Sequence, residues 1–282
     1  MVDDPSPLPP VSTTAIGVAA IRAAEGARPD ALFGDPLADA FVRAAGSLWS
    51  PTNVPEQQGR VAAVITWVRV RTRFLDDLLL DACANGCRQV VILGAGLDAR
   101  GFRLVWPPGV RLFELDLHHI LEFKERVVRD ERREPACERI VVPTDLAGDW
   151  TRDLGAAAFD PARPTTWIAE GLLVYLAEET RESVLDDLSA RSAPGSRFGL
   201  TLANAERRPE PSSPAGSVPS RPGDYMALWQ SEPPADPEAW LGARGWRVEL
   251  YDAYERAQLY GLPTTPTEAT RRHARLVDAT RV

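Results

Sequence analysis

A glycine pair followed by an acidic residue is the pattern in this sequence with the clearest chemical meaning. Gly94, Ala95 and Gly96 directly follow the apolar run 89–93, where small residues let the backbone approach a ligand. Asp116 lies 22 residues after Gly94, at the end of a second apolar run, where its carboxylate can accept both hydroxyls of a ribose. A Gly-x-Gly turn alone also occurs without a ligand, but the two features together favour a cofactor that contains adenosine.

Further acidic residues favour S-adenosylmethionine over a nicotinamide dinucleotide. Asp98 would place a carboxylate near the helix N-terminus on which a pyrophosphate would bind, whereas a sulfonium ligand has no phosphate to be repelled. Asp145 follows a third apolar run and Glu170 ends a fourth, so both are expected at the same edge. Asp145 could instead cap a helix, and Glu170 could be a solvated strand end.

Alternating strands and helices must position these residues. Short apolar runs rich in β-branched residues predict five strands, which helical patterns separate, and this alternation predicts a doubly wound, mostly parallel sheet. Two further predicted strands have no long helix between them and fit an antiparallel pair at one edge of the sheet. The predicted strands are 89–93, 111–116, 139–143, 166–170, 197–202, 245–251 and 273–279, and the predicted helices between strands are 117–133 and 178–191.

Three helices are predicted before the first strand. They cover residues 12–25, a short segment after Asp35-Pro36, and residues 61–84. We therefore expect an N-terminal helical cap over residues 1–84 and a catalytic core over 85–282. An insertion at about 204–244, which contains a proline-rich stretch, is expected to form a lid.

Composition excludes several classes of function. The formal net charge of −8 disfavours nucleic acid as a partner. The sequence has no apolar stretch of the ~18 residues that span a bilayer and no basic, apolar start typical of a secretory signal, so we expect a cytoplasmic protein. Lys124 is the only lysine and lacks the glycine of a phosphate loop. The spacing of the three cysteines and three histidines predicts no metal site: Cys83, Cys87, Cys137, His118, His119 and His273.

Several motifs, in the same order along the chain, resemble the leucine carboxyl methyltransferase family. Its bacterial branch includes O-methyltransferases of polyketide biosynthesis. The run from Gln89 to Leu104 is the most specific of them, and the similarity extends from about Ser12 to Gly199. The motifs that carry the resemblance are Arg71–Asp77, Gln89–Leu104, Phe113–Asp116, Pro143–Leu146 and Glu170–Leu176.

The resemblance implies a role for each motif in binding S-adenosylmethionine. Arg71 would pair with the carboxylate of the methionine moiety, with Arg73 as the nearby alternative. Glu170 would accept from the ammonium group. The remaining implied contacts are Gly94, Ala95 and Gly96 under the methionine and ribose, Asp116 with Leu117 at the ribose, and Asp145 with Leu146 at the adenine.

The family also implies a fold and a reaction. The fold would be the seven-stranded, Rossmann-like sheet of class I methyltransferases, and the reaction an in-line methyl transfer to an acceptor oxygen. The acceptor would be a carboxyl group of a polyketide-like natural product or of a peptide C-terminus. The alternatives are a phenolic or alcohol hydroxyl, and a protein that binds the cofactor without catalysis. The sequence leaves the acceptor's identity and the oligomeric state open.

Tyr175 is the candidate for orienting the acceptor, although it could equally be a core aromatic. His118 and His119 stand where relatives usually have a proline, and either could be a base for a hydroxyl acceptor. A carboxylate acceptor is already ionised and needs no base, so we interpret both as the first turn of a helix. An oxidoreductase with a Tyr-x-x-x-Lys pair is excluded because Ile120 lies four residues before Lys124.

Overall fold

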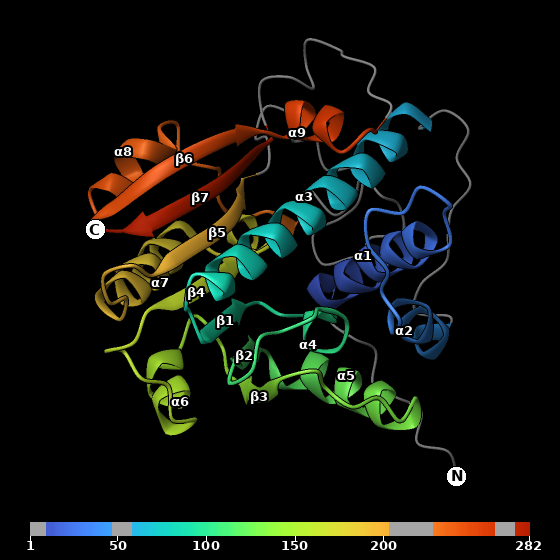
Figure 1. Ribbon diagram of the computed structural model, residues 1–282, viewed down its shortest axis with the longest axis horizontal. Helices are drawn as coiled ribbons and strands as arrows, with labels where there is room; N and C mark the ends of the chain where they lie inside the picture. Colours follow the sequence, from blue (N-terminus) through green and yellow to red (C-terminus); the bar gives the residue numbers. More distant parts are fainter. Residues whose placement is uncertain (1–9, 47–57, 203–227, 263–273) are drawn as a thin grey trace.

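A seven-stranded sheet forms the centre of the computed structural model, which describes residues 10–46, 58–202, 228–262 and 274–282 (Figure 1). The strand order is β3-β2-β1-β4-β5-β7-β6. This confirms the predicted α/β class and the seven strands. The strands are β1 (Gln89–Leu93), β2 (Arg111–Asp116), β3 (Glu138–Pro143), β4 (Thr165–Ala169), β5 (Arg197–Leu202), β6 (Trp246–Asp252) and β7 (Arg275–Arg281).

The strand directions place the ends of β1, β2 and β4 at one edge of the sheet. Strands β1 to β5 run parallel, with Val91 aligned to Phe113 on β2 and to Trp167 on β4. Strand β7 pairs antiparallel with both β5 and β6, as expected for the last two strands. All five residues of β1 are buried, because helices cover both faces of the sheet around it.

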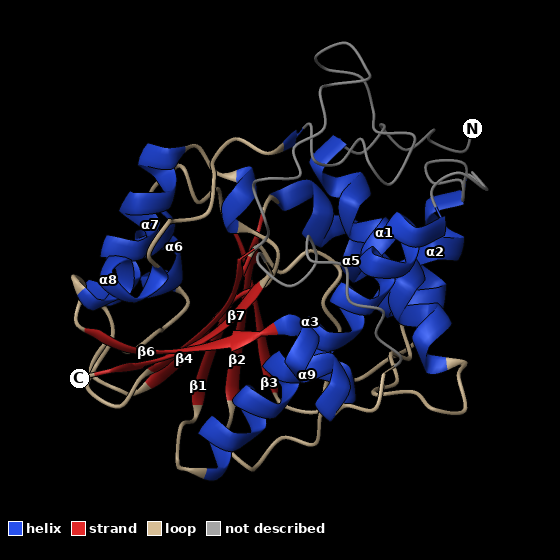
Figure 2. Cartoon of the chain, turned by 90° about the horizontal axis from the view of Figure 1, so that it is seen from above, coloured by secondary structure: helices blue, strands red, loops and turns tan. Residues whose placement is uncertain are grey.

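Helices cover the two faces of the sheet in separate layers (Figure 2). One layer packs its apolar residues against Phe113, Trp167 and Phe198. The other packs against Val90, Ile92 and Ile168. The first layer consists of α6 (Trp150–Ala156), α7 (Glu178–Ala190) and α8 (Pro237–Gly242), and the second of α3 (Gln58–Ala84) and α9 (Ala253–Leu259).

The first two helices pack beside the sheet. Helices α1 (Pro10–Gly26) and α2 (Ala38–Ala45) contact each other, and α1 also contacts α3. Their apolar residues form a third cluster with α5 (His118–Asp130) and with Leu97 in the turn after β1. This cluster holds α1 next to that turn.

Short elements differ most from the predicted ones. Helices α4 (Arg100–Arg103), α6, α8 and α9 were not predicted, and α2 begins at Ala38 rather than at Pro36. The proline-rich stretch of the predicted lid lies outside the described residues. The last part of the predicted lid forms α8, which packs against β6.

Candidate functional site

The turn after β1 requires glycine at two positions. Gly94 and Gly96 have φ of 59° and 46°, a region that residues with a side chain rarely adopt. A Cβ atom at Gly94 would lie 2.6 Å from Leu172 Cδ1, and one at Gly96 would lie 3.4 Å from Ala15 Cβ on α1. The turn is tied to β2, since the Ala95 amide donates to the Leu115 carbonyl (2.9 Å). The side chains of Leu172 and Ala15 therefore pack directly against the backbone of this turn.

Asp116 ends β2 directly beside this turn. Its Oδ2 accepts from the Gly96 amide (2.6 Å) and its Oδ1 from the Leu117 amide (2.7 Å). Burial raises the pKa of Asp116, and these two hydrogen bonds only partly offset that effect. Each carboxylate oxygen keeps a further lone pair, so the group can still accept ribose hydroxyls.

Glu170, the residue after β4, lies among three arginines from three helices. Its Oε1 accepts from Arg22 Nη2 on α1 and from Arg71 Nε on α3, both at 3.0 Å. Its Oε2 lies 2.8 Å from Arg100 Nη1. Burial alone would raise the pKa of Glu170, but the positive charges of Arg100, Arg22 and Arg71 hold it well below its usual range. The carboxylate therefore stays ionised although its side chain is only 6% exposed.

Arg71 and Arg73 have different surroundings. The Arg71 side chain is 11% exposed and packs against Gly171, whose φ is 63° and where a Cβ would lie 3.0 Å from Arg71 Nη1. The Arg73 side chain is 42% exposed, pairs with Asp77 and donates to the Leu32 carbonyl. The structure therefore brings Arg71, and not Arg73, to Glu170.

The adenine-side candidates lie on the loop after β3. The Thr144 amide donates to the Asp116 carbonyl (2.9 Å), which joins this loop to the end of β2. Asp145 is exposed and accepts from the Ala147 amide (2.9 Å). The side chain of Leu146 packs in the core next to Trp150. Asp145 thus offers a carboxylate at this edge, and Leu146 offers its backbone.

Tyr175 lies in the short 3-10 helix η3 (Leu173–Tyr175). Its hydroxyl shares hydrogen bonds with Thr14 of α1 and with Trp229, and it lies within electrostatic reach of Arg71. Burial raises the pKa of Tyr175, so at neutral pH it is a neutral phenol. The side chain is therefore neither a plain core aromatic nor free in solvent.

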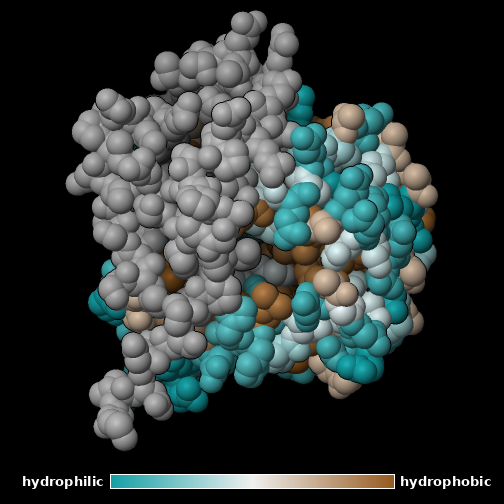
Figure 3. Space-filling view, turned by 180° about the vertical axis from the view of Figure 1, so that it is seen from behind, coloured by the Kyte–Doolittle hydropathy of each residue, from teal (hydrophilic) through white to brown (hydrophobic). Residues whose placement is uncertain are grey.

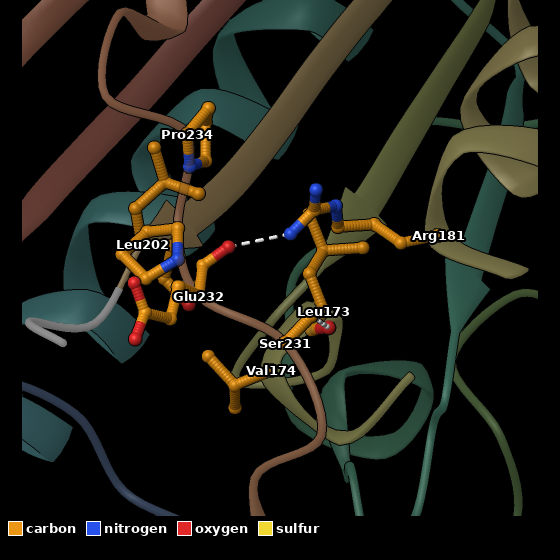
Figure 4. A pocket seen from close by; sticks show the side chains of 9 residues that line it. Leu173, Val174, Arg181, Leu202, Ser231, Glu232 and Pro234 are labelled. Atoms are coloured by element: carbon orange, nitrogen blue, oxygen red, sulfur yellow. Dashed lines mark hydrogen bonds between the residues drawn. The ribbon is translucent and has the colours of Figure 1, made fainter. Parts of the chain in front are cut away.

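A short segment, residues 229–234, lies over η3. The Gln230 amide donates to the Val174 carbonyl (2.7 Å), and Arg181 on α7 donates to the Glu232 carbonyl. Figure 4 shows this contact beside a small apolar cavity, lined by Leu173, Leu202 and Pro234 among others. The space-filling view shows hydrophobic residues gathered near the middle of the rear face, with mostly hydrophilic residues farther out (Figure 3).

The two adjacent histidines begin α5. The side chain of His118 is 79% exposed and lies 3.9 Å from Glu122. His119 is half-buried and within electrostatic reach of Asp116. In the described ranges, no group of three or more His, Cys, Asp or Glu residues could hold a metal ion. The helices described there are also too short or too polar to cross a membrane.

The sequence reasoning missed several charged residues of this site. Arg22 binds Glu170 from α1, and Arg100 joins Glu170 to Asp98 and Asp76. Asp98 and Arg100 belong to the specific run after β1. Asp76 follows Thr72 by one helical turn, so the sequence could have suggested that these two residues share one face of their helix. Arg22 has no comparable signal, because nothing local links α1 to the end of β4.

These residues fit S-adenosylmethionine chemically. The amino-acid end of that cofactor carries a carboxylate and an ammonium group, for which Arg71 and Glu170 supply the opposite charges. Glu170 Oε2 is buried, lies 2.8 Å from Arg100 Nη1 and accepts no directed hydrogen bond from the described residues, so its hydrogen-bonding capacity is not used up. The turn with Gly94 and Gly96 lies directly beside Asp116, whose carboxylate supplies acceptors for ribose hydroxyls.

The sequence is similar to those of known methyltransferases. The profile of the leucine carboxyl methyltransferase family matches residues 15–189. A proposed S-adenosyl-L-methionine-dependent methyltransferase of Streptomyces avermitilis is 47% identical over 96% of this chain and 95% of its own length. A protein of the same description from Streptomyces coelicolor is 50% identical over 90% of this chain and 89% of its own length.

Solved structures agree with the fold. A DUF574 family protein from Streptomyces avermitilis has a TM-score of 0.52 at 14% identity, covering 94% of this chain and 97% of its own. A proposed methyltransferase from Thermobifida fusca has a TM-score of 0.51 at 16% identity, covering 93% and 94%. Both similarities concern the arrangement of the sheet and helices.

Proposed function

The chain belongs to the leucine carboxyl methyltransferase family and is an S-adenosylmethionine-dependent methyltransferase, and from this premise we propose that its acceptor is a carboxyl group. The acceptor would be a small natural-product acid of the polyketide kind or the C-terminal carboxylate of a peptide. The observation that carries this proposal is Tyr175, a neutral phenol within electrostatic reach of Arg71. A carboxylate acceptor needs a hydrogen-bond donor and a positive neighbour, but no base.

The proposed cofactor site uses the carboxyl edge of β1, β2 and β4. Arg71 binds the carboxylate of the amino-acid moiety, Glu170 accepts from its ammonium group, and Asp116 accepts from the ribose hydroxyls. The remaining proposed contacts are backbone or edge contacts from Gly94, Ala95, Gly96, Leu117, Asp145 and Leu146. In this proposal the helical cap, residues 1–84, contributes Arg71 to a site built mainly on the core.

When bound, S-adenosylmethionine supplies an electrophilic methyl group on its sulfonium. The chain's own residues hold the acceptor in line and exclude water. Tyr175, which burial keeps protonated, donates a hydrogen bond to the acceptor. His118 is mostly exposed and paired with Glu122, which does not favour a role as a base.

Titration calorimetry tests the cofactor site. The protein is titrated with S-adenosylmethionine, S-adenosylhomocysteine and NAD. We expect micromolar binding of the first two and none of NAD. Binding of NAD alone, or of none of the three, would contradict the proposed site.

The acceptor class is tested with S-adenosylmethionine that carries a labelled methyl group. The panel contains aromatic acids, fatty acids, a peptide with a free C-terminus, and phenols. Mild alkali releases labelled methanol from a methyl ester but not from a methyl ether. We expect alkali-labile label; alkali-stable label would assign a hydroxyl acceptor, and no label with any acceptor would favour a binding protein without catalysis.

Tyr175→Phe tests the proposed role of the phenol. The variant keeps the ring and loses the hydroxyl, so we expect turnover of the best acceptor to fall about tenfold, the value of one hydrogen bond to a charged group. Affinity for S-adenosylhomocysteine should stay within about twofold of wild type, since the hydroxyl is proposed to face the acceptor. Unchanged turnover would remove Tyr175 from the mechanism.

A further inference from the structure

Arg100 is a fully buried arginine that joins three parts of the cofactor site. It begins α4 just after the glycine turn, and its side chain is 0% exposed. Its Nε donates to Asp76 Oδ1 on α3 (2.7 Å), and its Nη2 donates to the Thr72 carbonyl (3.3 Å). Its Nη1 pairs with Asp98 in the turn and lies 2.8 Å from Glu170 Oε2.

These contacts separate Arg100 from the residues that can touch a ligand. Each nitrogen of its guanidinium already has a partner, and the side chain has no surface open to solvent. Arg71 differs from Arg100 in two respects. Its side chain is partly exposed, and its carboxylate partner in the described residues is Glu170, which it shares with Arg22 and Arg100. Arg100 can therefore act on the cofactor only through the residues that it holds, of which Glu170 is the one proposed to bind the ammonium group.

The charges around the two arginines also differ. Burial alone would lower the pKa of Arg100, but Asp98, Glu170 and Asp76 raise it well above its usual range. The pKa of Arg71 is lowered, because burial outweighs the attraction of the shared Glu170. Arg100 is thus a fully compensated, fixed charge, whereas the compensation of Arg71 is incomplete and a second carboxylate would complete it.

We propose that Arg100 is a positioning residue for cofactor binding, which holds the Glu170 carboxylate in the orientation that accepts the cofactor's ammonium group. This inference rests on the proposed function of the site. Arg71 exchanges part of its contact with Glu170 for the cofactor's carboxylate, while Arg100 keeps Glu170 in place. The planar guanidinium suits this task because it reaches Asp76, Asp98 and Glu170 at once, which a lysine cannot do.

The test compares two conservative variants, Arg100→Lys and Arg103→Lys. Arg103 is a matched control, since it also forms a buried bidentate pair with Asp76 (2.6 and 2.7 Å). Its ion pair in the described residues does not involve Glu170. Each variant is titrated with S-adenosylhomocysteine and with 5′-methylthioadenosine, which has the adenosine and thioether but no amino-acid moiety. Thermal unfolding measures the purely structural cost of each change.

We expect Arg100→Lys to weaken S-adenosylhomocysteine binding by about tenfold or more and to leave 5′-methylthioadenosine binding within about twofold. Arg103→Lys should lower stability and keep both affinities. An equal loss for both ligands in Arg100→Lys, or no loss for either, would overturn the positioning role.

A further variant covers the case in which Arg100→Lys does not fold. Asp76→Asn removes the carboxylate charge that fixes Arg100 Nε and that also pairs with Arg103, so it is compared with Arg103→Lys; it should show the selective loss that Arg103→Lys lacks, whereas equal or absent losses would again overturn the role. The positioning role fails alone if Arg100→Lys shows no selective loss while wild type binds both ligands. If wild type binds neither ligand, the proposed function fails and the inference fails with it.

Discussion

At Asp116 a single side chain combines a structural and a binding role. Its two oxygens fix the amides of Gly96 and Leu117, and the residue is half-buried at the end of β2. The group is thus held in place before a ligand arrives, which lowers the entropic cost of binding. The same surroundings raise the pKa of Asp116, and this shift makes cofactor binding depend on pH.

We predict that Asp116→Asn weakens S-adenosylhomocysteine binding by about 1.5–3 kcal/mol, since ribose hydroxyls lose an ionised acceptor. In wild type, affinity should fall as pH decreases through the raised pKa of Asp116, above the ordinary 3.8, because protonation removes acceptor capacity. Calorimetry across pH measures both effects, and Asp116→Asn should lack this part of the pH dependence.

The control for this prediction is Asp81→Asn. Asp81 is exposed and accepts from Arg197 near the opposite end of the sheet, so its loss should leave cofactor affinity unchanged. Equal affinity of wild type and Asp116→Asn would show that ribose recognition lies elsewhere.

At the scale of elements, the turn between β1 and α4 determines how closely a ligand can approach the sheet. Gly94→Ala would place a methyl group 2.6 Å from Leu172 and would force a residue with a side chain to a φ of 59°. Gly109→Ala imposes a similar backbone strain at a φ of 78°, in open space before β2. The two variants therefore separate strain from ligand approach.

We predict that Gly109→Ala loses about 1–2 kcal/mol of unfolding free energy, the cost of the left-handed conformation, and that Gly94→Ala loses at least as much because the Leu172 side chain must also shift. Only Gly94→Ala should also lose cofactor affinity. Chemical denaturation and calorimetry on both variants measure this. Undiminished affinity in Gly94→Ala would show that the backbone of this turn does not face the ligand.

Elements could be predicted from the sequence in proportion to their length and periodicity. The strand 89–93 was predicted with the bounds that the structure has, because four consecutive apolar residues, Val90 to Leu93, followed by a glycine are typical of a buried parallel strand. The seven-residue helices α6 and α9 were missed, since two turns carry too little periodic signal. Where motifs are local, the sequence predicted the placement of residues: Gly94 lies in the turn after β1, and Asp116 lies beside that turn at the end of β2.

Contacts between distant segments could not be predicted in the same way. Arg22 and Glu170 are 148 positions apart, and their pairing depends on how α1 packs beside the sheet. No period or spacing within either segment encodes that contact. The charge network around Glu170 therefore became visible only in three dimensions.

At the scale of the whole molecule, the charge network around Glu170 makes the stability of the fold depend on pH. Glu170 has a pKa well below its ordinary 4.5, so the folded state holds its proton less tightly than the unfolded chain does. The resulting stabilisation is fully present above pH 4.5 and is lost as pH falls toward the folded-state pKa.

We predict that Glu170→Gln costs about 3–5 kcal/mol of unfolding free energy near neutral pH, because three buried arginines lose a shared counter-charge. The difference from wild type should shrink below pH 4.5, where the unfolded wild-type chain takes up the proton. Denaturation curves at several pH values measure it. A difference that does not change with pH would mean that Glu170 is not ionised in the folded protein.

The position of β7 between β5 and β6 has a consequence for synthesis on the ribosome. Strands β5 and β6 leave the ribosome first, yet each forms its ladder here with a strand that follows both. Until residues 275–281 emerge, β5 keeps one open edge and β6 has no partner from this sheet. Open strand edges invite pairing with other chains. The nascent chain is therefore most prone to aggregate, and most in need of a chaperone, shortly before its sheet is complete.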